Sequence, residues 1–510
     1  MITLESYVLG RWQAGSGPTQ ILRDPTSEEP IAEVHPQGPD LGQVLAYGRE
    51  TGGPALRALG FPRRAALLLA LSKAIHAHRD ELLELSIQNA GSTRGDAKFD
   101  VDGATGTLAA YAQFGKELGE RAYHLDGAPT QLGRTPRFSG QHLFVPRPGI
   151  AVHVNAFNFP AWNQCEKMAC ALLAGMPVLE KPGTPTALVA WRIARIIVES
   201  SLLPEGAFQF LCGGGRELAE HLGPQDVLAF TGSSTTGAKL RGHPVVVRNN
   251  VRVNIEADSL NAAVLAPDVT RDSETYDQFL ANVELDIVQK TGQKCTAVRR
   301  VLVPAERVRE VADDLVARLT KVQVGDPRSG ETRMGPLVSA QQLADVRAGI
   351  AALSQVAEVL CGGAGAVHAK GYFVAPTLLL AKSSESQVFH ELEVFGPVAT
   401  LLPYSGKAAD AIALVNRGGG GLVASLYSND KAWSDEVVLG IAPWHGRIWI
   451  GSDRTAGQAL APGIVLPASL HGGPGRAGGG AELGGLRGLE PYFQRLAVQG
   501  FQGYLEKLGV

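Results

Sequence analysis

Apolar and polar positions follow two different periods between Gly149 and Asp258, and this pattern divides the segment into strands and helices. Short apolar runs of strand length are separated by longer stretches with helical spacing. The predicted strands are 150–154, 177–181, 208–212, 227–230 and 251–255, and the predicted helices are 162–173, 187–203 and two shorter ones that follow Gly215 and Ser234. Repeated strand–helix units predict a parallel, doubly wound sheet with ligands at the carboxyl ends of its strands.

The pattern on either side of this segment predicts a larger α/β protein. The N-terminal part reads as a cap of short strands followed by a helix over 63–89 that ends near Gly91. After Asp258 a second α/β section is predicted, with elements at 278–290, 301–303, 306–322 and 398–401. A chain of 510 residues is too long to fold around a single hydrophobic core, so roughly three domains are expected.

Two strand-like segments belong to neither α/β section. They are 137–145 and 492–501, and each leaves strand edges that need a partner. Another subunit is an economical partner, so we expect a homodimer or a higher homo-oligomer. The Gly-rich segment 471–480 has the composition of a flexible linker. Apolar anchors follow it at Leu483 and Leu486, which favours an ordered loop near the site.

Composition excludes several classes of partner. The formal net charge is only -3 and no basic patch is present, so nucleic acid is not expected. Five cysteines at irregular spacing argue against a disulfide framework and for a reducing compartment, and no ligand spacing indicates a metal site. We find no N-terminal signal pattern and no apolar run of membrane-spanning length, so we expect a cytoplasmic protein without membrane contact.

Cys295 is the residue with the clearest chemical signal. It follows a Gly-Gln-Lys turn and precedes Arg299, Arg300 and the apolar run 301–303. A thiol on a short loop beside cations is expected to have a lowered pKa, and the thiolate is the nucleophilic form. A lone cysteine is more often a small buried hydrophobe. Other segments of the chain favour a nucleophilic role for Cys295, because their residues have a clear function only beside a covalently bound substrate.

Six separated segments resemble motifs of the aldehyde dehydrogenase family and occur in that family's order. They are Asn-Ala-Phe-Asn-Phe-Pro at 155–160, Lys-Pro-Gly-Thr at 181–184, Phe-Thr-Gly-Ser at 230–233 with Gly237, Glu256, Gly-Gln-Lys-Cys at 292–295 and Glu-Val-Phe-Gly-Pro at 393–397. The resemblance covers nearly the whole chain. It implies an α/β fold with a doubly wound parallel-sheet nucleotide-binding domain, a second α/β catalytic domain and a small β arm for oligomerisation.

The resemblance implies roles for three catalytic residues. Cys295 would attack an aldehyde, and the oxyanion that forms needs fixed donors. The Cys295 backbone N–H and the Asn158 amide would supply them. Glu256 would be the general base that activates water to hydrolyse the thioester. Taken singly, Asn158 could be a helix cap and Glu256 a solvated strand end. The catalytic roles are therefore inferred from the occurrence of all the motifs together.

The resemblance also implies a nicotinamide cofactor. Glu393 would bind the ribose hydroxyls and Phe395 would flank the ring. The residues implied in cofactor binding are Asn155, Phe157, Lys181, Thr184, Gly213, Phe230, Thr231, Gly232, Ser233, Thr236, Glu393 and Phe395. Thr184 departs from the glutamate of many NAD-preferring members. A carboxylate there repels a 2′-phosphate, whereas threonine can donate a hydrogen bond, which favours NADP and leaves NAD possible.

Further departures indicate a narrower branch of the family. Glu256-Ala-Asp-Ser-Leu-Asn replaces the usual Glu-Leu-Gly-Gly, and Leu470-His-Gly-Gly replaces Pro-Phe-Gly-Gly. These segments resemble enzymes of benzoyl-CoA and phenylacetate degradation, some stand-alone and some bifunctional. The implied substrate is a small aldehyde linked to CoA, a semialdehyde that is oxidised to the free acid. A general aldehyde dehydrogenase, a CoA-acylating one and a non-catalytic member of the fold remain alternatives.

The same resemblance divides the chain into domains. The NAD(P)-binding domain is expected at 1–133 and 150–258, and the catalytic domain at 259–473. The oligomerisation arm is expected at 134–149 and 490–510, with the Gly-rich loop at 474–489 between the catalytic domain and the arm.

Overall fold

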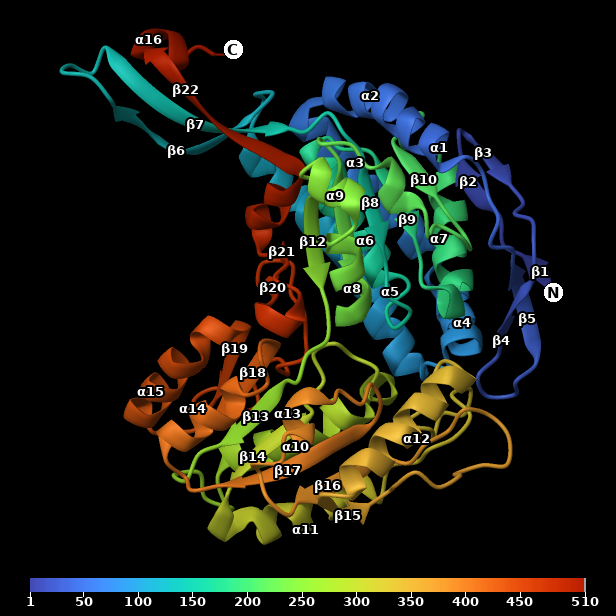
Figure 1. Ribbon diagram of the computed structural model, residues 1–510, viewed down its shortest axis with the longest axis vertical. Helices are drawn as coiled ribbons and strands as arrows, with labels where there is room; N and C mark the ends of the chain where they lie inside the picture. Colours follow the sequence, from blue (N-terminus) through green and yellow to red (C-terminus); the bar gives the residue numbers. More distant parts are fainter. Residues whose placement is uncertain (509–510) are drawn as a thin grey trace.

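The computed structural model of the protein describes residues 1–508. Its two halves each contain one seven-stranded sheet, and a long β arm projects from the half that holds the first sheet (Figure 1). The last two positions of the expected arm lie outside the described residues. Among the residues that are described, no helix combines the length and the apolar composition needed to cross a bilayer.

The first sheet has the strand order β12-β11-β8-β9-β10-β2-β3. Its five parallel strands are β8 (Ala151–Val154), β9 (Val178–Lys181), β10 (Phe208–Phe210), β11 (Val227–Thr231) and β12 (Arg252–Glu256). The N-terminal β2 (Ser6–Val8) and β3 (Arg11–Gln13) extend one edge in antiparallel fashion, so they continue this sheet. The strands predicted between Gly149 and Asp258 are therefore confirmed within a few residues.

The two faces of this sheet are covered by different helices because side chains alternate along a strand. Val178 packs into a core with α3 (Gly60–Ala77), α5 (Arg94–Phe114), α6 (Trp162–Ala174) and α7 (Ala187–Glu199). Leu179 points to the other face, where α1 (Leu41–Tyr47) and α9 (Pro244–Arg248) cover it. Because helices cover both faces of the sheet, residues on both sides of these strands are buried, and the strands are continuous apolar runs in the sequence.

The second sheet has the order β15-β16-β17-β14-β13-β18-β19. Its strands are β13 (Ala262–Leu265), β14 (Arg300–Pro304), β15 (Ala357–Cys361), β16 (Thr377–Ala381), β17 (Val398–Tyr404), β18 (Gly421–Tyr427) and β19 (His445–Gly451), all parallel except β15. One face packs on α10 (Glu274–Val288) and α11 (Val308–Leu319). The other packs on α12 (Ala340–Ser354), α14 (Ala408–Asn416) and α15 (Lys431–Ile441).

The arm is a three-stranded antiparallel sheet of β6 (His124–Gln131), β7 (Phe138–Pro146) and β22 (Phe493–Phe501). The sequence predicts that β7 and β22 each need a partner outside the chain. Instead they pair with each other, from Phe493 opposite Pro146 to Phe501 opposite Phe138. The arm also starts at His124 and not at 134, since β6 completes it. The outer edges of β6 and β22 remain unpaired within the described chain.

Two helix predictions differ from the structure. The segment 63–89 forms two helices, because His78 leaves helical geometry between α3 and α4 (Arg79–Ala90). The helix expected after Gly215 is only the short 3-10 turn η4 (Leu218–His221). Leu222 after this turn is already extended, and Gly223-Pro224 follows it; a proline disfavours helical geometry in the preceding residue.

Candidate active site

Cys295 lies on the tight loop that joins α10 to β14. Lys290 and Thr291 both have φ of 55°, and Gly292 has φ of 66°. A Cβ atom on Gly292 would meet the Gly396 carbonyl oxygen at 2.2 Å, so this position requires glycine. The loop therefore closes against the backbone at Gly396 and presents a half-buried Cys295.

The hydrogen bonds of the two arginines after Cys295 go to backbone carbonyls and not to the thiol, and those of Arg299 brace this loop. Arg299 donates hydrogen bonds to the Gly396 carbonyl at 2.8 Å and to the Gly292 carbonyl at 2.9 Å. Arg300 donates to carbonyls of Leu260 and of α14. The expectation that these cations lower the thiol pKa is wrong. Burial and the carboxylate of Glu256 instead raise the pKa of Cys295 well above its ordinary value.

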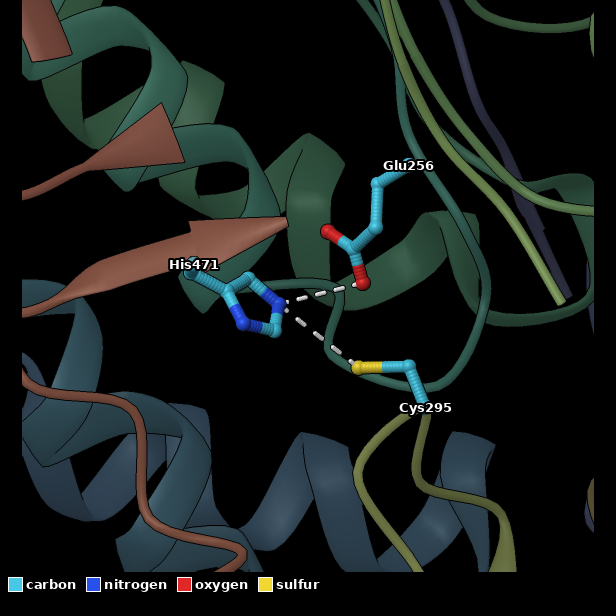
Figure 2. A group of neighbouring side chains, drawn as sticks. All are labelled: Glu256, Cys295 and His471. Carbon is cyan, nitrogen blue, oxygen red and sulfur yellow. Dashed lines mark hydrogen bonds and ion pairs between the residues drawn. The ribbon is translucent and has the colours of Figure 1, made fainter. Parts of the chain in front are cut away.

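Glu256 and His471 face Cys295 from two other elements (Figure 2). Glu256 ends β12 and is 2% exposed, and His471 lies in β20 (Leu470–Gly472) and is 4% exposed. His471 Nε2 is 3.1 Å from Glu256 Oε1 and 3.9 Å from Cys295 Sγ. The first contact has ion-pair distance, although its angles do not make a hydrogen bond. The second is within the range of a sulfur hydrogen bond.

The carboxylate and the imidazole shift each other's protonation. Burial raises the pKa of Glu256, but His471, Lys167 and the Cys295 thiol together outweigh burial and hold the pKa well below its usual range. Burial lowers the pKa of His471, but Glu256 and Glu166 together more than compensate, so this pKa is raised. The pair therefore favours the carboxylate and makes the imidazole a stronger base than an isolated one, beside a thiol that favours its protonated form.

Asn158 lies in the loop between β8 and α6, beside the nucleophile loop. Its Nδ2 donates to the Gln293 carbonyl at 3.0 Å, two residues before Cys295. An amide nitrogen carries a second hydrogen, which is free to act as an oxyanion donor. The alternative role as a helix cap is excluded, since the N-cap of α6 is Ala161 and Asp100 accepts from the first N–H groups.

A buried ionic cluster lies behind Glu256. Lys167 Nζ is 3.4 Å from Glu166 Oε1 and 3.3 Å from Glu482 Oε2, and carboxylate oxygens of Glu166, Glu256 and Glu482 lie within 4.8 Å of one another. Nothing in the sequence pattern predicted a role for Lys167, Glu166 or Glu482. Helix α6 is buried on every side, so its polar residues break no amphipathic pattern that could have marked them.

The expected phosphate-binding turn follows β11. Ser233 caps α8 (Ser234–Arg241), and its hydroxyl accepts from the Thr236 N–H. Ser233 and Thr236 are exposed, whereas Thr231 is buried, with Gly232 partly buried between them. A helix N-terminus with accessible N–H groups can bind phosphate. The Phe230 side chain is not exposed at this turn. It is buried in a small core with Ile255 and Ala257.

The residues expected near the adenosine end lie at the carboxyl ends of adjacent strands. Lys181 ends β9, and burial lowers the pKa of its ammonium. Gly213 follows β10 with φ of 82°, and a Cβ there would meet the His35 carbonyl at 2.4 Å. Thr184 begins the short turn η3 (Thr184–Thr186) and is partly exposed. The structure thus brings the three residues to one edge of the sheet.

The residues expected near the nicotinamide come from both halves. Burial raises the pKa of Glu393 to about 7, with Arg299 Nε at 3.8 Å. The rings of Phe157 and Phe395 meet edge to face at 5.9 Å. Asn155 donates one of its two amide hydrogens to Glu180 at 2.8 Å.

Several buried oxygen atoms in this region lack a donor. They are Asn155 Oδ1, Thr231 Oγ1 and Glu393 Oε1. Unpaired buried acceptors are costly unless a ligand supplies donors. Ribose hydroxyls and a carboxamide are such donors, so these residues fit a nicotinamide dinucleotide.

Comparisons with known proteins agree with this geometry. Residues 12–495 match the aldehyde dehydrogenase family. A 3,4-dehydroadipyl-CoA semialdehyde dehydrogenase from Aromatoleum evansii is 45% identical, over 92% of this chain and 93% of the relative. A hydroxyisobutyraldehyde dehydrogenase from Mycolicibacterium austroafricanum is 29% identical, over 96% and 92%. The solved NAD+ complex of an aldehyde dehydrogenase from Bacillus cereus has a TM-score of 0.85 at 23% identity, covering 98% of this chain and 97% of that one.

Proposed function

Because the chain belongs to the aldehyde dehydrogenase family, we propose that it oxidises a CoA-thioester semialdehyde to the carboxylic acid with NADP, in benzoate or phenylacetate degradation. The observation that carries the substrate class is the 45% identity, over nearly the full length of both chains, to an enzyme named for a CoA semialdehyde. The residues of the site support the chemistry step by step.

The first half of the reaction forms a bond between Cys295 Sγ and the aldehyde carbon. The carbonyl electron pair moves to oxygen, and the second hydrogen of the Asn158 amide and the Cys295 N–H stabilise the anion. A bound oxidised nicotinamide would supply the acceptor for the hydride that leaves this carbon. The sulfur then carries the substrate as a thioester. Glu393 and the Phe157–Phe395 ring pair would hold the cofactor on this side of the site.

The second half is hydrolysis of the thioester. Glu256 is buried and ionised beside the sulfur, so it can take a proton from an attacking water. The C–S bond then breaks, and the acid leaves. This role separates the proposal from a CoA-acylating enzyme, in which free CoA replaces water and needs no base to activate water. A non-catalytic member of the fold could lose these groups without consequence.

Thr184 and Lys181 support the preference for NADP. Threonine at this position adds no negative charge near a 2′-phosphate, and the buried ammonium of Lys181 lies at the end of the neighbouring strand. We include a reducing compartment such as the cytoplasm in the proposal, since all five cysteines are free thiols. The proposal also includes a homodimer or larger homo-oligomer whose subunits associate through the arm.

The test is an assay of cofactor reduction with a CoA-linked semialdehyde and the matched semialdehyde that lacks CoA. Each is run with NADP and NAD, with and without free CoA. The proposal expects the CoA-linked substrate and NADP to give the highest kcat/KM, and free acid as product whether or not CoA is added. A strict requirement for free CoA would support the acylating alternative, and equal efficiency with both substrates would support a general aldehyde dehydrogenase.

A further inference from the structure

The imidazole of His471 has no role in the chemistry described so far. It occupies the position of the apolar ring in the Pro-Phe-Gly-Gly segment that this chain lacks. Its Nε2 lies between two reactive atoms, Glu256 Oε1 and Cys295 Sγ (Figure 2). A histidine within reach of a nucleophilic thiol and a carboxylate is the arrangement that activates cysteine in other folds.

The backbone holds this imidazole in place. His471 pairs with Glu482 of β21 (Ala481–Leu483), and the next residue, Gly472, has φ of 133°. A Cβ on Gly446 of β19 would meet the Gly472 carbonyl at 1.8 Å, so the strand is packed closely against the second sheet. The side chain therefore reaches the thiol from a rigid support, and its position is set by strand pairing.

Charged groups surround the imidazole from every packed element. Glu256 of β12 and Cys295 of the nucleophile loop contact it directly. Glu166 and Arg447 also act on it, and Lys167 and Glu482 lie next to Glu166. Among these charged groups, Glu256 has the strongest effect on the pKa of His471 and favours the imidazolium. In the described chain the imidazole lies within hydrogen-bond distance of Cys295 Sγ, whereas Arg299 and Arg447 act on the thiol only through their charge.

We propose that His471 Nε2 accepts the thiol proton of Cys295, with Glu256 stabilising the imidazolium, so that attack starts from a thiolate–imidazolium pair. This rests on the proposed function only in taking Cys295 as the nucleophile. The S–H bond breaks and an N–H bond forms, and the sulfur electron pair then attacks the carbonyl carbon. When the thioester is hydrolysed, the same proton returns to the leaving sulfur, so the step is balanced over one turnover.

The proposal predicts a shift in the pH dependence of the thiol. In the wild type, loss of one proton from the thiol–imidazolium pair yields the reactive thiolate beside a cation. Without the imidazole, the thiolate would form beside Glu256 in a buried setting, which raises its pKa further. Thiolate formation should then require a higher pH.

The test is the rate of alkylation by iodoacetamide as a function of pH, without aldehyde or cofactor. Cys361 is also partly accessible, so all proteins carry Cys361→Ser, and Cys295→Ala gives the blank. His471→Phe is compared with His471→Gln and with His368→Phe, which removes an exposed histidine. A chelator is present throughout, because a thiol, an imidazole and a carboxylate within 4.8 Å could bind Zn2+.

We expect both His471 variants to move the rising limb of the profile upward by about one pH unit or more, which lowers the alkylation rate at pH 7 by about tenfold or more. The His368 variant should match the wild type. A limb at the wild-type pH in either folded His471 variant would overturn the proposal, and folding is checked by thermal unfolding. Because no substrate is involved, this outcome is independent of whether the substrate proposal holds.

Discussion

At the scale of single residues, the thiol of Cys295 is controlled by burial and by a carboxylate. Burial and Glu256 both disfavour the thiolate, so its pKa is raised. The stable form before substrate binding is therefore a protonated thiol, which a neighbouring base must activate. This contrasts with cysteines at which flanking cations lower the pKa directly.

Replacing the nucleophile should separate chemistry from cofactor binding. We expect Cys295→Ala to lower aldehyde oxidation by at least about three orders of magnitude, because no covalent intermediate can form. NADP affinity should remain close to that of the wild type, since the dinucleotide is held by other residues. Steady-state assays and fluorescence titration with NADP measure the two effects. Turnover near the wild-type rate would refute the assignment of Cys295.

Removing the general base should spare the first turnover. In Glu256→Gln the acylation and the hydride transfer continue, slowed by the loss of the carboxylate that supports His471 as a base, whereas the thioester waits for unactivated water. Rapid mixing should show a burst of reduced cofactor followed by a steady state slower by about two to four orders of magnitude. Glu256→Asp is the control that retains a base. Loss of the burst itself would identify Glu256 as the base that takes the thiol proton directly.

Thr184 should determine cofactor preference. Thr184→Glu adds a negative charge near the 2′-phosphate, so kcat/KM with NADP should fall about tenfold or more. The value with NAD should change little, and Thr184→Ser should resemble the wild type because it keeps the hydroxyl. Equal efficiency with NADP and NAD in the unmodified enzyme would contradict the prediction.

Motif residues were predictable from the sequence because each stands next to a turn or strand end with recognisable chemistry. Cys295, Glu256 and Asn158 come from distant segments, and the structure brings them to one site. The contact between His471 and Cys295 was not predictable. His471 lies in a Gly-rich segment without periodicity, and its place depends on pairing with Glu482.

At the scale of elements, the nucleophile loop depends on one glycine. Gly292→Ala combines a left-handed φ, which costs about 1–2 kcal/mol for a side chain, with a contact of 2.2 Å to the Gly396 carbonyl. We expect lower thermal stability and a larger loss of activity, because the loop that carries Cys295 must move. Gly106→Ala in α5 is the control, since a Cβ there meets nothing within 4 Å. Equal effects of the two substitutions would contradict the argument.

Strand positions were easier to predict than helix ends. Strands covered on both faces, such as β8 and β14, are continuous apolar runs, and these were identified. The break at His78 could not be predicted, because apolar residues continue on either side of it. The pairing of β7 with β22 joins segments more than 340 positions apart, and alternation alone does not specify a partner.

At the scale of the whole molecule, the arm leaves apolar side chains in water. Leu125, Phe138, Leu496 and Phe501 are all exposed on it, and the outer edges of β6 and β22 are unpaired. Such edges and side chains favour association with another copy of the chain. A stable, fully active monomer at micromolar concentration would rule out this reading.

Disrupting the arm should therefore weaken self-association. We expect Leu496→Asp combined with Phe501→Asp to lower the sedimentation coefficient toward that of a monomer and to reduce activity. Deleting the chain from Tyr492 onward should be more severe, since it also removes the Tyr492 contact to His153 at 3.1 Å. Leu439→Asp, an exposed leucine on α15, is the control and should leave the assembly unchanged.

The central claim is that a CoA-linked semialdehyde becomes a thioester on Cys295 that Glu256 is needed to hydrolyse. The most direct measurement is mass spectrometry of Glu256→Gln after mixing with the CoA semialdehyde and NADP and quenching in acid. We expect an added mass equal to the complete CoA-linked acyl group, on the peptide that contains Cys295. We also expect this adduct to be absent without NADP. An unmodified Cys295 peptide after the burst, or an adduct on another residue, would contradict the account.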